Sequence, residues 1–121
     1  MVANQQQPAE AVSLYYQRVD AGDVPGILQL FAENAVYRRA GYEPIVGHDA
    51  LRDFYLNQRV IRSGQHRVTK LVCDGADVAV QGTFAGTLHD GSVASLEFAD
   101  FFRVENGVFA ERTTYFFIAL V

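Results

Sequence analysis

Two strands folded back on each other are predicted by residues 96–118, which read LEFADFFRVENGVFAERTTYFFI. Both halves are rich in aromatic residues, and Asn106-Gly107 between them is typical of a two-residue hairpin turn. Such a turn pairs Glu105 with Val108 on either side of it. Counting outward predicts three further pairs: Phe102 with Glu111, Asp100 with Thr113, and Phe98 with Tyr115. Side chains alternate along a strand, so these six are expected to share one face of the sheet.

Asp100 stands out on this face because it is a carboxylate in mid-strand with apolar neighbours on both sides. An ionised carboxylate is expensive to bury without a partner, whereas a protonated or hydrogen-bonded one is not. Asp100 is therefore the first candidate for chemistry, as a neutral donor to an enolate-like ligand. The alternative is a structural carboxylate that bonds a neighbouring threonine or glutamine.

A second hairpin turn is predicted at Asp90-Gly91, between strands over residues 77–89 and 92–105. Read as a two-residue turn, it pairs Gln81 with Asp100 and Thr83 with Phe98. Gln81 and Thr83 are then expected on the same face as Asp100.

Three helices are predicted ahead of these strands, over residues 8–22, 23–31 and 48–60, with a brief strand over 35–39. The first carries an apolar stripe at helical spacing, made of Val12, Tyr15, Tyr16 and Val19. From residue 65 onward the chain reads as strand. Helices followed by an antiparallel meander indicate an α+β fold. Residues 1–121 are expected to form one domain in which three helices cover one face of a curved sheet.

Both faces of the last hairpin are apolar, although a sheet with one solvated face should alternate apolar and polar residues. We expect a second copy of the chain to cover the outer face in a homodimer.

The composition limits the function classes. A net charge of −4 and a pI near 5.2 predict no partnership with nucleic acid or anionic membranes. Cys73 is the single cysteine, the N-terminus lacks the pattern of a secretory signal, and no stretch is long enough to span a membrane. We expect a cytoplasmic protein. The three histidines have no second ligand at metal-binding spacing, so neither a metal nor another cofactor is expected.

The chain resembles the NTF2-like superfamily, and within it the ketosteroid isomerases and SnoaL-like polyketide cyclases. The resemblance lies in four segments: Gly22-Asp23 with Leu30-Phe31-Ala32-Glu33-Asn34-Ala35, Gly41-Tyr42-Glu43-Pro44, Arg52-Asp53-Phe54-Tyr55, and Asp100-Phe101-Phe102-Arg103. It covers nearly the whole chain and implies the cone-shaped NTF2-like fold, with helices packed on a curved, mixed sheet.

The resemblance to ketosteroid isomerases implies roles for individual residues. Tyr15 and Asp100 match the pair that hydrogen-bonds a developing oxyanion, and Tyr55 matches a supporting tyrosine. The family's aspartate base is replaced by Arg39, which stays protonated and cannot abstract a proton. The Asp-Arg-Asp set of limonene-epoxide hydrolases is absent at the matching positions.

Glu111 is the predicted substitute base, because it shares the face of Asp100 in the expected register; alternatively it forms an ion pair with an arginine. Arg39 could orient a carboxylate or enolate of the substrate, or neutralise Glu111. The remaining substrate-binding candidates are those expected around the same cone: Phe54, Tyr55, Gln81, Thr83, Phe98, Phe102, Thr113 and Tyr115.

Two functions follow from this pattern. The first is a cofactor-independent isomerase or cyclase, acting through an enol or enolate on an apolar polycyclic or polyketide-derived molecule. Tyr15 and Asp100 would stabilise the oxyanion and Glu111 would move the proton. The alternative is a ligand-binding or dimeric interaction module that keeps the cone without chemistry, which the loss of the aspartate base favours.

Overall fold

A computed structural model describes residues 6–118 of the chain. Its elements follow in the order α1 (Gln6–Ala21), α2 (Val24–Gln29), β1 (Phe31–Arg39), β2 (Ile45–Val46), α3 (His48–Asp53), the π-helix η1 (Phe54–Gln58), β3 (Ile61–Asp74), β4 (Asp77–Leu88), β5 (Val93–Glu105) and β6 (Val108–Phe117). The predicted α+β order, helices first and then a long meander, is confirmed.

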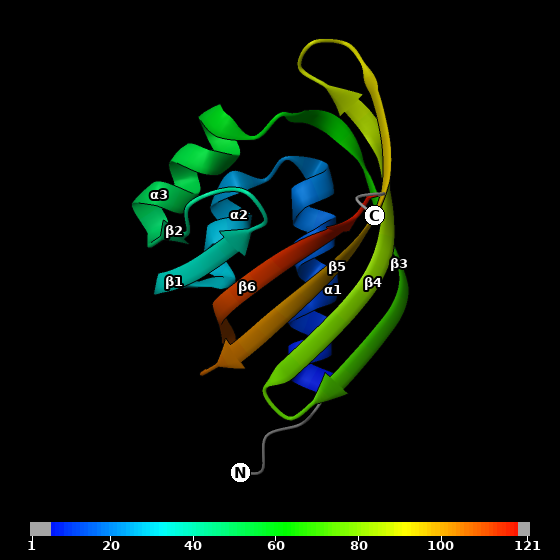
Figure 1. The fold of residues 1–121 in the computed structure, drawn as a ribbon. Coiled ribbons are helices and arrows are strands. Elements are labelled where there is room, and N and C mark those ends of the chain that lie inside the picture. Colours follow the sequence, from blue (N-terminus) through cyan, green and yellow to red (C-terminus); the bar gives the residue numbers. More distant parts are fainter. Residues whose placement is uncertain (1–5, 119–121) are drawn as a thin grey trace.

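The strands within residues 6–118 form one curved sheet in the order β2-β1-β6-β5-β4-β3 (Figure 1). Strands β1 and β6 run parallel, and every other neighbouring pair is antiparallel. The sheet is therefore mixed, as the family resemblance implied. The helices lie against its concave face, with α1 crossing behind β5 and β6 in the view of Figure 1.

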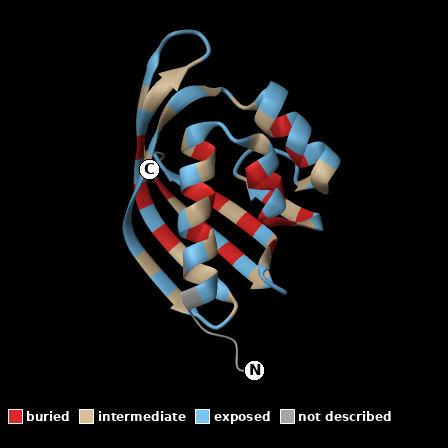
Figure 2. Cartoon of the chain, turned by 180° about the vertical axis from the view of Figure 1, so that it is seen from behind, coloured by how far each residue is buried: buried red, intermediate tan, exposed pale blue. Residues whose placement is uncertain are grey.

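Helix α1 provides the main contact between the helical layer and the sheet. Its predicted stripe, Val12, Tyr15, Tyr16 and Val19, is buried, and Figure 2 shows the buried positions of the helix and strands facing one another. Gly22 follows with a φ of +70°, a left-handed conformation that lets the chain leave the helix. Within residues 6–118, no helix is both long and apolar enough to cross a membrane.

The third predicted helix is correct in position but not in regularity. It begins at His48, changes from an α-helix to a π-helix at Phe54 and ends at Gln58, two residues before the predicted end. The π-turn is closed by a 2.8 Å hydrogen bond from the Arg59 amide to the Phe54 carbonyl. Tyr55 lies in this wider turn, and π-bulges are frequent at functional sites.

The turn between β4 and β5 has one residue more than predicted. The Leu88 amide donates to the Ser92 carbonyl, which leaves a three-residue loop with Gly91 at a φ of +88°. Asp90 stabilises this loop by accepting hydrogen bonds from the amide and hydroxyl of Ser92. The extra residue moves the register by one, so that Val80 rather than Gln81 lies opposite Asp100.

The hairpin between β5 and β6 begins as predicted and then departs from the prediction. Asn106 and Gly107 both have positive φ, and Glu105 pairs with Val108. A β-bulge at Ala110 then inserts one residue into β6, so that Arg103 pairs with Glu111 and Asp100 with Thr114.

A one-residue slip exchanges the faces of a strand. Arg112 and Thr114 are therefore buried on the concave face, whereas Glu111 and Tyr115 are exposed on the outer face. The predicted placement of Glu111, Thr113 and Tyr115 beside Asp100 is wrong. The predicted placement of Gln81 and Thr83 is wrong for the same reason, since both are exposed.

The outer face of the sheet carries large apolar side chains that no helix within residues 6–118 covers. Phe101 and Tyr115 are half exposed and their rings are in contact, with centroids 5.8 Å apart. Phe117 lies on the same face and is largely exposed. An apolar patch of this kind marks an interaction surface, and we propose that it joins two copies of the chain.

We expect light scattering at micromolar concentration to give about twice the chain mass of 13.4 kDa. Phe101→Glu should yield the monomer, because burying an unpaired carboxylate at the interface is unfavourable. Gln17→Glu, which adds the same charge on the exposed side of α1, should leave the dimer intact. A native protein that scatters as a monomer would refute the dimer.

Candidate active site

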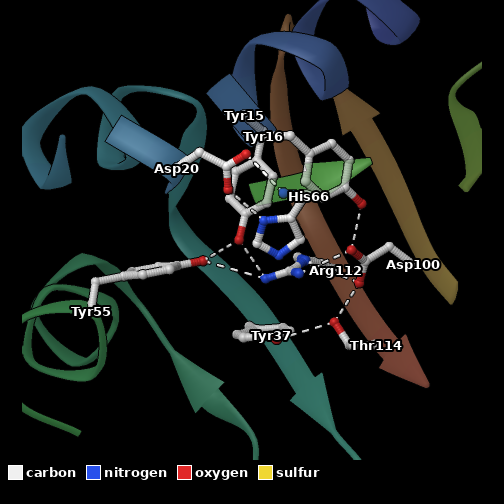
Figure 3. Close-up of polar contacts among 9 residues, drawn as sticks. All are labelled: Tyr15, Tyr16, Asp20, Tyr37, Tyr55, His66, Asp100, Arg112 and Thr114. Carbon is white, nitrogen blue, oxygen red and sulfur yellow. Dashed lines mark hydrogen bonds and ion pairs between the residues drawn. The ribbon is translucent and has the colours of Figure 1, made fainter. Parts of the chain in front are cut away.

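The centre of the concave face is a buried ion pair between Asp100 and Arg112 (Figure 3). Asp100 has no exposed surface and Arg112 has 6%. The guanidinium binds the carboxylate through two nitrogens, Nε at 3.2 Å from Oδ1 and Nη2 at 2.9 Å from Oδ2. This bidentate geometry is the strongest form of a carboxylate–arginine contact.

Two hydroxyl groups complete the hydrogen bonding of Asp100. Tyr16 donates to Oδ2 at 2.5 Å, and Thr114 donates to Oδ1. Tyr37 in turn bonds the Thr114 hydroxyl at 3.1 Å. Because every group around the carboxylate is a donor, Asp100 acts as an acceptor; the predicted role as a neutral donor to a ligand is wrong.

Arg112 also links Asp100 to a pair of tyrosines. Its Nη1 donates to the Tyr15 hydroxyl at 2.5 Å and lies 3.4 Å from the Tyr55 hydroxyl. The Tyr15 and Tyr55 hydroxyls are themselves 2.6 Å apart. The guanidinium carbon lies 4.7 Å from the centre of the Tyr15 ring and 4.4 Å from that of Tyr37, so ring faces further stabilise the cation.

Burial determines the protonation of these groups. Burial raises the pKa of Tyr15 and Tyr16 well above the ordinary value for a phenol, and that of Tyr37 to about 12. All three remain protonated donors at neutral pH. Burial acts to lower the pKa of Arg112, but the Asp100 carboxylate and the surrounding tyrosines outweigh it and hold that pKa well above its usual value.

A second polar pair lies beside this network. His66 on β3 places Nδ1 at 2.6 Å from Oδ1 of Asp20, and its backbone amide donates to Oδ2 at 2.9 Å. Because a carboxylate only accepts, the imidazole proton belongs on Nδ1. Nε2 is then the basic atom, and it makes no hydrogen bond within residues 6–118.

The His66 ring is held by aromatic neighbours, with centroids 4.8 Å from Phe84 and 5.3 Å from Tyr16. Gly64 makes room for this packing, since a Cβ there would lie 2.4 Å from the Phe84 ring. Burial lowers the pKa of His66, although the Asp20 hydrogen bond opposes this effect. His66 is therefore a neutral base at pH 7, oriented by a carboxylate.

A cavity of about 350 Å³ opens where the end of α1, the π-helix and the β3–β4 strands meet. Its walls include Val19, Ile27 and Phe84, which are apolar, together with the polar Asp20 and Tyr55. The cavity is thus lined by Tyr55, which bonds Tyr15 and Arg112, and by Asp20, which bonds His66. Arg59, Arg62 and His89 also line it, so the walls are mixed in polarity, and its size suits a small organic molecule with polar groups.

The structure brings together some of the predicted site residues and separates others. Tyr15 and Asp100 both contact Arg112, and Tyr55 joins them as predicted from the resemblance. The rings of Phe54, Phe98 and Phe102 are buried in the same core. The residues on the outer face are Gln81, Thr83, Glu111, Thr113 and Tyr115.

Glu111 is separated from Asp100 by the thickness of the sheet. It lies 3.8 Å from Arg38 in an exposed ion pair, which matches the alternative role for Glu111 but with a different arginine from the one anticipated. Arg39 occupies the end of β1 and lines a separate cavity beside α3.

Sequence reasoning missed Arg112, Tyr16, Asp20 and His66 as functional residues. The apolar stripe of the first helix includes Tyr16 and could have indicated that it is buried. Arg112 faces the interior only because of the β-bulge, which the sequence pattern does not reveal. Asp20 and His66 are 46 positions apart and follow no motif. Among residues 6–118, no three histidine, cysteine, aspartate or glutamate side chains converge as a metal site would require.

Comparisons with known proteins agree with this fold. A family model for the SnoaL-like domain matches residues 12–112. A search of the curated proteins found no significant match.

Three solved structures illustrate the likeness. The epoxide hydrolase/cyclase-like enzyme SalBIII, which has a role in pyran ring formation in the polyether salinomycin, is 24% identical, with a TM-score of 0.84 and coverage of 95% of this chain and 94% of that one. An NTF2-like protein of unknown function from Burkholderia pseudomallei is 22% identical, with a TM-score of 0.82 and coverage of 92% and 91%. An LEH-like epoxide hydrolase from M. tuberculosis is 17% identical, with a TM-score of 0.81 and coverage of 93% and 84%. At these identities the structures establish the NTF2-like fold.

Removing the cation from the buried pair should destabilise the protein strongly. We expect Arg112→Met to lower the free energy of unfolding by about 3–5 kcal/mol, because it leaves Asp100 buried without its counter-charge. Chemical denaturation measures the change. Arg103→Met, which removes two exposed ion pairs with Asp77 and Glu105, should have little effect. Asp100→Leu combined with Arg112→Met should recover part of the loss; equal effects of the two single arginine variants would contradict the central role of the pair.

Acidification should destabilise the protein through His66. Its pKa is lower in the folded state than the ordinary value near 6.5, so the unfolded state binds the proton first as the pH falls. Stability from this residue is present above pH 6.5 and is lost below it, with a slope approaching about 1.4 kcal/mol per pH unit. Denaturation between pH 7.5 and 5.5 should show this slope in the native protein and a flatter one in His66→Gln. His89→Gln, an exposed control, should retain the native slope.

Proposed function

Because the chain belongs to the SnoaL-like domain family, we propose that it is a cofactor-independent enzyme that isomerises or cyclises an apolar carbonyl compound through an enol or enolate. The substrate class is a polycyclic or polyketide-derived molecule small enough for the cavity at the end of α1. The observation that carries the proposal is that Tyr55 and Asp20 both line this cavity. Tyr55 ends a hydrogen-bonded chain from Arg112, and Asp20 orients His66.

The phenol chain supplies the oxyanion-stabilising donor. Arg112 donates to the Tyr15 oxygen, so the Tyr15 proton points to the oxygen of Tyr55. The Tyr55 proton is then free for a substrate carbonyl oxygen in the cavity. Charge that develops on that oxygen is stabilised through two polarised hydroxyls and the buried guanidinium, and such chains strengthen one another in a low-dielectric interior.

Asp100 serves this chain as a positioning residue. It holds the guanidinium in place through two nitrogens and neutralises its charge in the unliganded protein. Tyr15 and Asp100 thus act in the same oxyanion system, with Arg112 between them.

The histidine pair supplies the base. Nε2 of His66 accepts a proton from the carbon next to the substrate carbonyl, while Asp20 stabilises the imidazolium that forms on the other side of the ring. In an isomerisation the same proton returns to a different carbon. In a cyclisation the enolate carbon attacks a second carbonyl carbon of the same molecule, the C=O π bond breaks, and the imidazolium returns its proton to the alkoxide that forms. His66 replaces the aspartate base whose position Arg39 occupies.

The reaction can be tested with a model ketone, 2-tetralone. NMR follows the exchange of its hydrogens next to the carbonyl for deuterium from the solvent. The protein should accelerate the exchange above buffer, and His66→Gln should reduce the acceleration by about 10²-fold or more because the general base is lost. Asp20→Asn should cause a similar loss by favouring the other tautomer. Tyr55→Phe should remove part of the rate through the lost oxyanion donor. His48→Gln, which removes a histidine that does not line this cavity, serves as the histidine control.

The binding-module alternative makes a different prediction in the same experiment. If 2-naphthol, a mimic of the enolate, binds in the cavity with an affinity that depends on Tyr55 but no exchange is accelerated, the protein binds its ligand without this chemistry. Absence of both binding and exchange would refute the site itself.

A further inference from the structure

The Arg39 guanidinium lies between aromatic rings and has no polar partner among the described residues. Within residues 6–118 it makes no hydrogen bond or ion pair, and its Nε is buried and unsatisfied. Arginines normally satisfy their donors with carboxylates, carbonyls or water. A guanidinium left in this state therefore requires an explanation.

Aromatic rings hold the Arg39 guanidinium in place. Its central carbon lies 4.2 Å from the centre of the Tyr42 ring and 4.3 Å from that of Phe54. Contacts of this length restrict the side chain and leave the terminal nitrogens as its free hydrogen-bonding edge. The orientation is thus set without a charged partner.

This edge lies at a cavity of about 350 Å³ that is distinct from the proposed reaction site. The cavity is bounded by β2 and α3, and Pro44, Ile45 and Ala50 give it apolar walls. The π-helix contributes to both cavities, because Gln58 lines this one and Tyr55 and Leu56 line the other.

Two carboxylates also border the cavity, and they limit the charge of a ligand. Asp53 is engaged, since Asn57 donates to its Oδ1 at 2.8 Å and Gln58 donates to its Oδ2. Glu43 forms no ion pair with Arg39. Both carboxylates repel any anion, and they repel a dianion such as phosphate about twice as strongly as a monoanion, which also contacts the Arg39 cation and the apolar wall.

We propose that Arg39 is the anchor of a second ligand site, which binds a monocarboxylate with an apolar or aromatic body. The carboxylate oxygens receive hydrogen bonds from the terminal nitrogens of Arg39, and the body packs against Pro44, Ile45 and Ala50. This site goes beyond the proposed reaction, because it uses neither the His66 pair nor Tyr55.

The test is an NMR titration of the full chain with sodium benzoate, which follows the backbone amides of Val46, Ala50 and Gln58. Benzoate should bind and shift these amides, whereas benzamide, which has the same shape without charge, should bind at least about tenfold more weakly. Arg39→Gln should weaken benzoate binding to the same extent. Arg38→Gln is the matched control, since this neighbouring arginine faces Glu111, and it should leave binding unchanged.

Two further variants complete the experiment. Glu43→Gln should tighten benzoate binding about two- to fivefold by removing a repulsive charge. If Arg39→Gln does not fold, Arg39→Lys decides instead, because it keeps the charge but loses the planar edge and should bind benzoate more weakly than Arg38→Lys does.

The proposal is overturned if Arg39 variants bind benzoate as the native protein does, if benzamide binds equally well, or if benzylamine binds more tightly than benzoate. Tyr55→Phe and His66→Gln should retain benzoate binding. A failure of the carboxylate site is therefore distinguishable from a failure of the proposed reaction.

Discussion

The bidentate contact between Asp100 and Arg112 is the interaction around which the interior is arranged. Two opposite charges are removed from water at the centre of the concave face, where neither would be tolerated alone. Three further polar groups satisfy their remaining hydrogen-bonding positions: Tyr16 and Thr114 for the carboxylate, and Tyr15 for the guanidinium. The aromatic core around them excludes water and maintains the low dielectric in which these contacts are strong.

This ion pair exists because of the β-bulge at Ala110. Without the inserted residue, Arg112 would face outward and Glu111 inward, opposite Phe102 and diagonal to Asp100 on the same face. Two buried carboxylates without a cation would repel each other and raise the cost of folding. The inserted residue replaces that arrangement with a neutralised pair, and the same slip places Tyr115 on the outer face next to Phe101. One local irregularity therefore determines both the polar interior and the apolar exterior of the sheet.

The interior network also divides its functions between stability and chemistry. Asp100, Arg112 and Tyr16 are buried within it and serve chiefly to hold its geometry. Tyr55 and Asp20 lie at its boundary with the cavity, where a ligand can reach them. Rigid, charge-balanced interior groups that support a few accessible ones are the arrangement expected for preorganised catalysis. Arg39 lines the other cavity and belongs neither to the buried network nor to the groups that line the proposed reaction site.

The sequence by itself determined the elements, the family and the inward positions of Tyr15 and Asp100. Helical periodicity, the Asn106-Gly107 turn and alternation along β5 are local properties, and local patterns can be read without the fold. Only the tertiary structure decided the register of β6, because a strand alternates equally well in either of two registers and the burial of Arg112 selects between them. The same holds for His66 and Asp20, whose contact joins β3 to α1 across 46 residues and leaves no trace in spacing or composition.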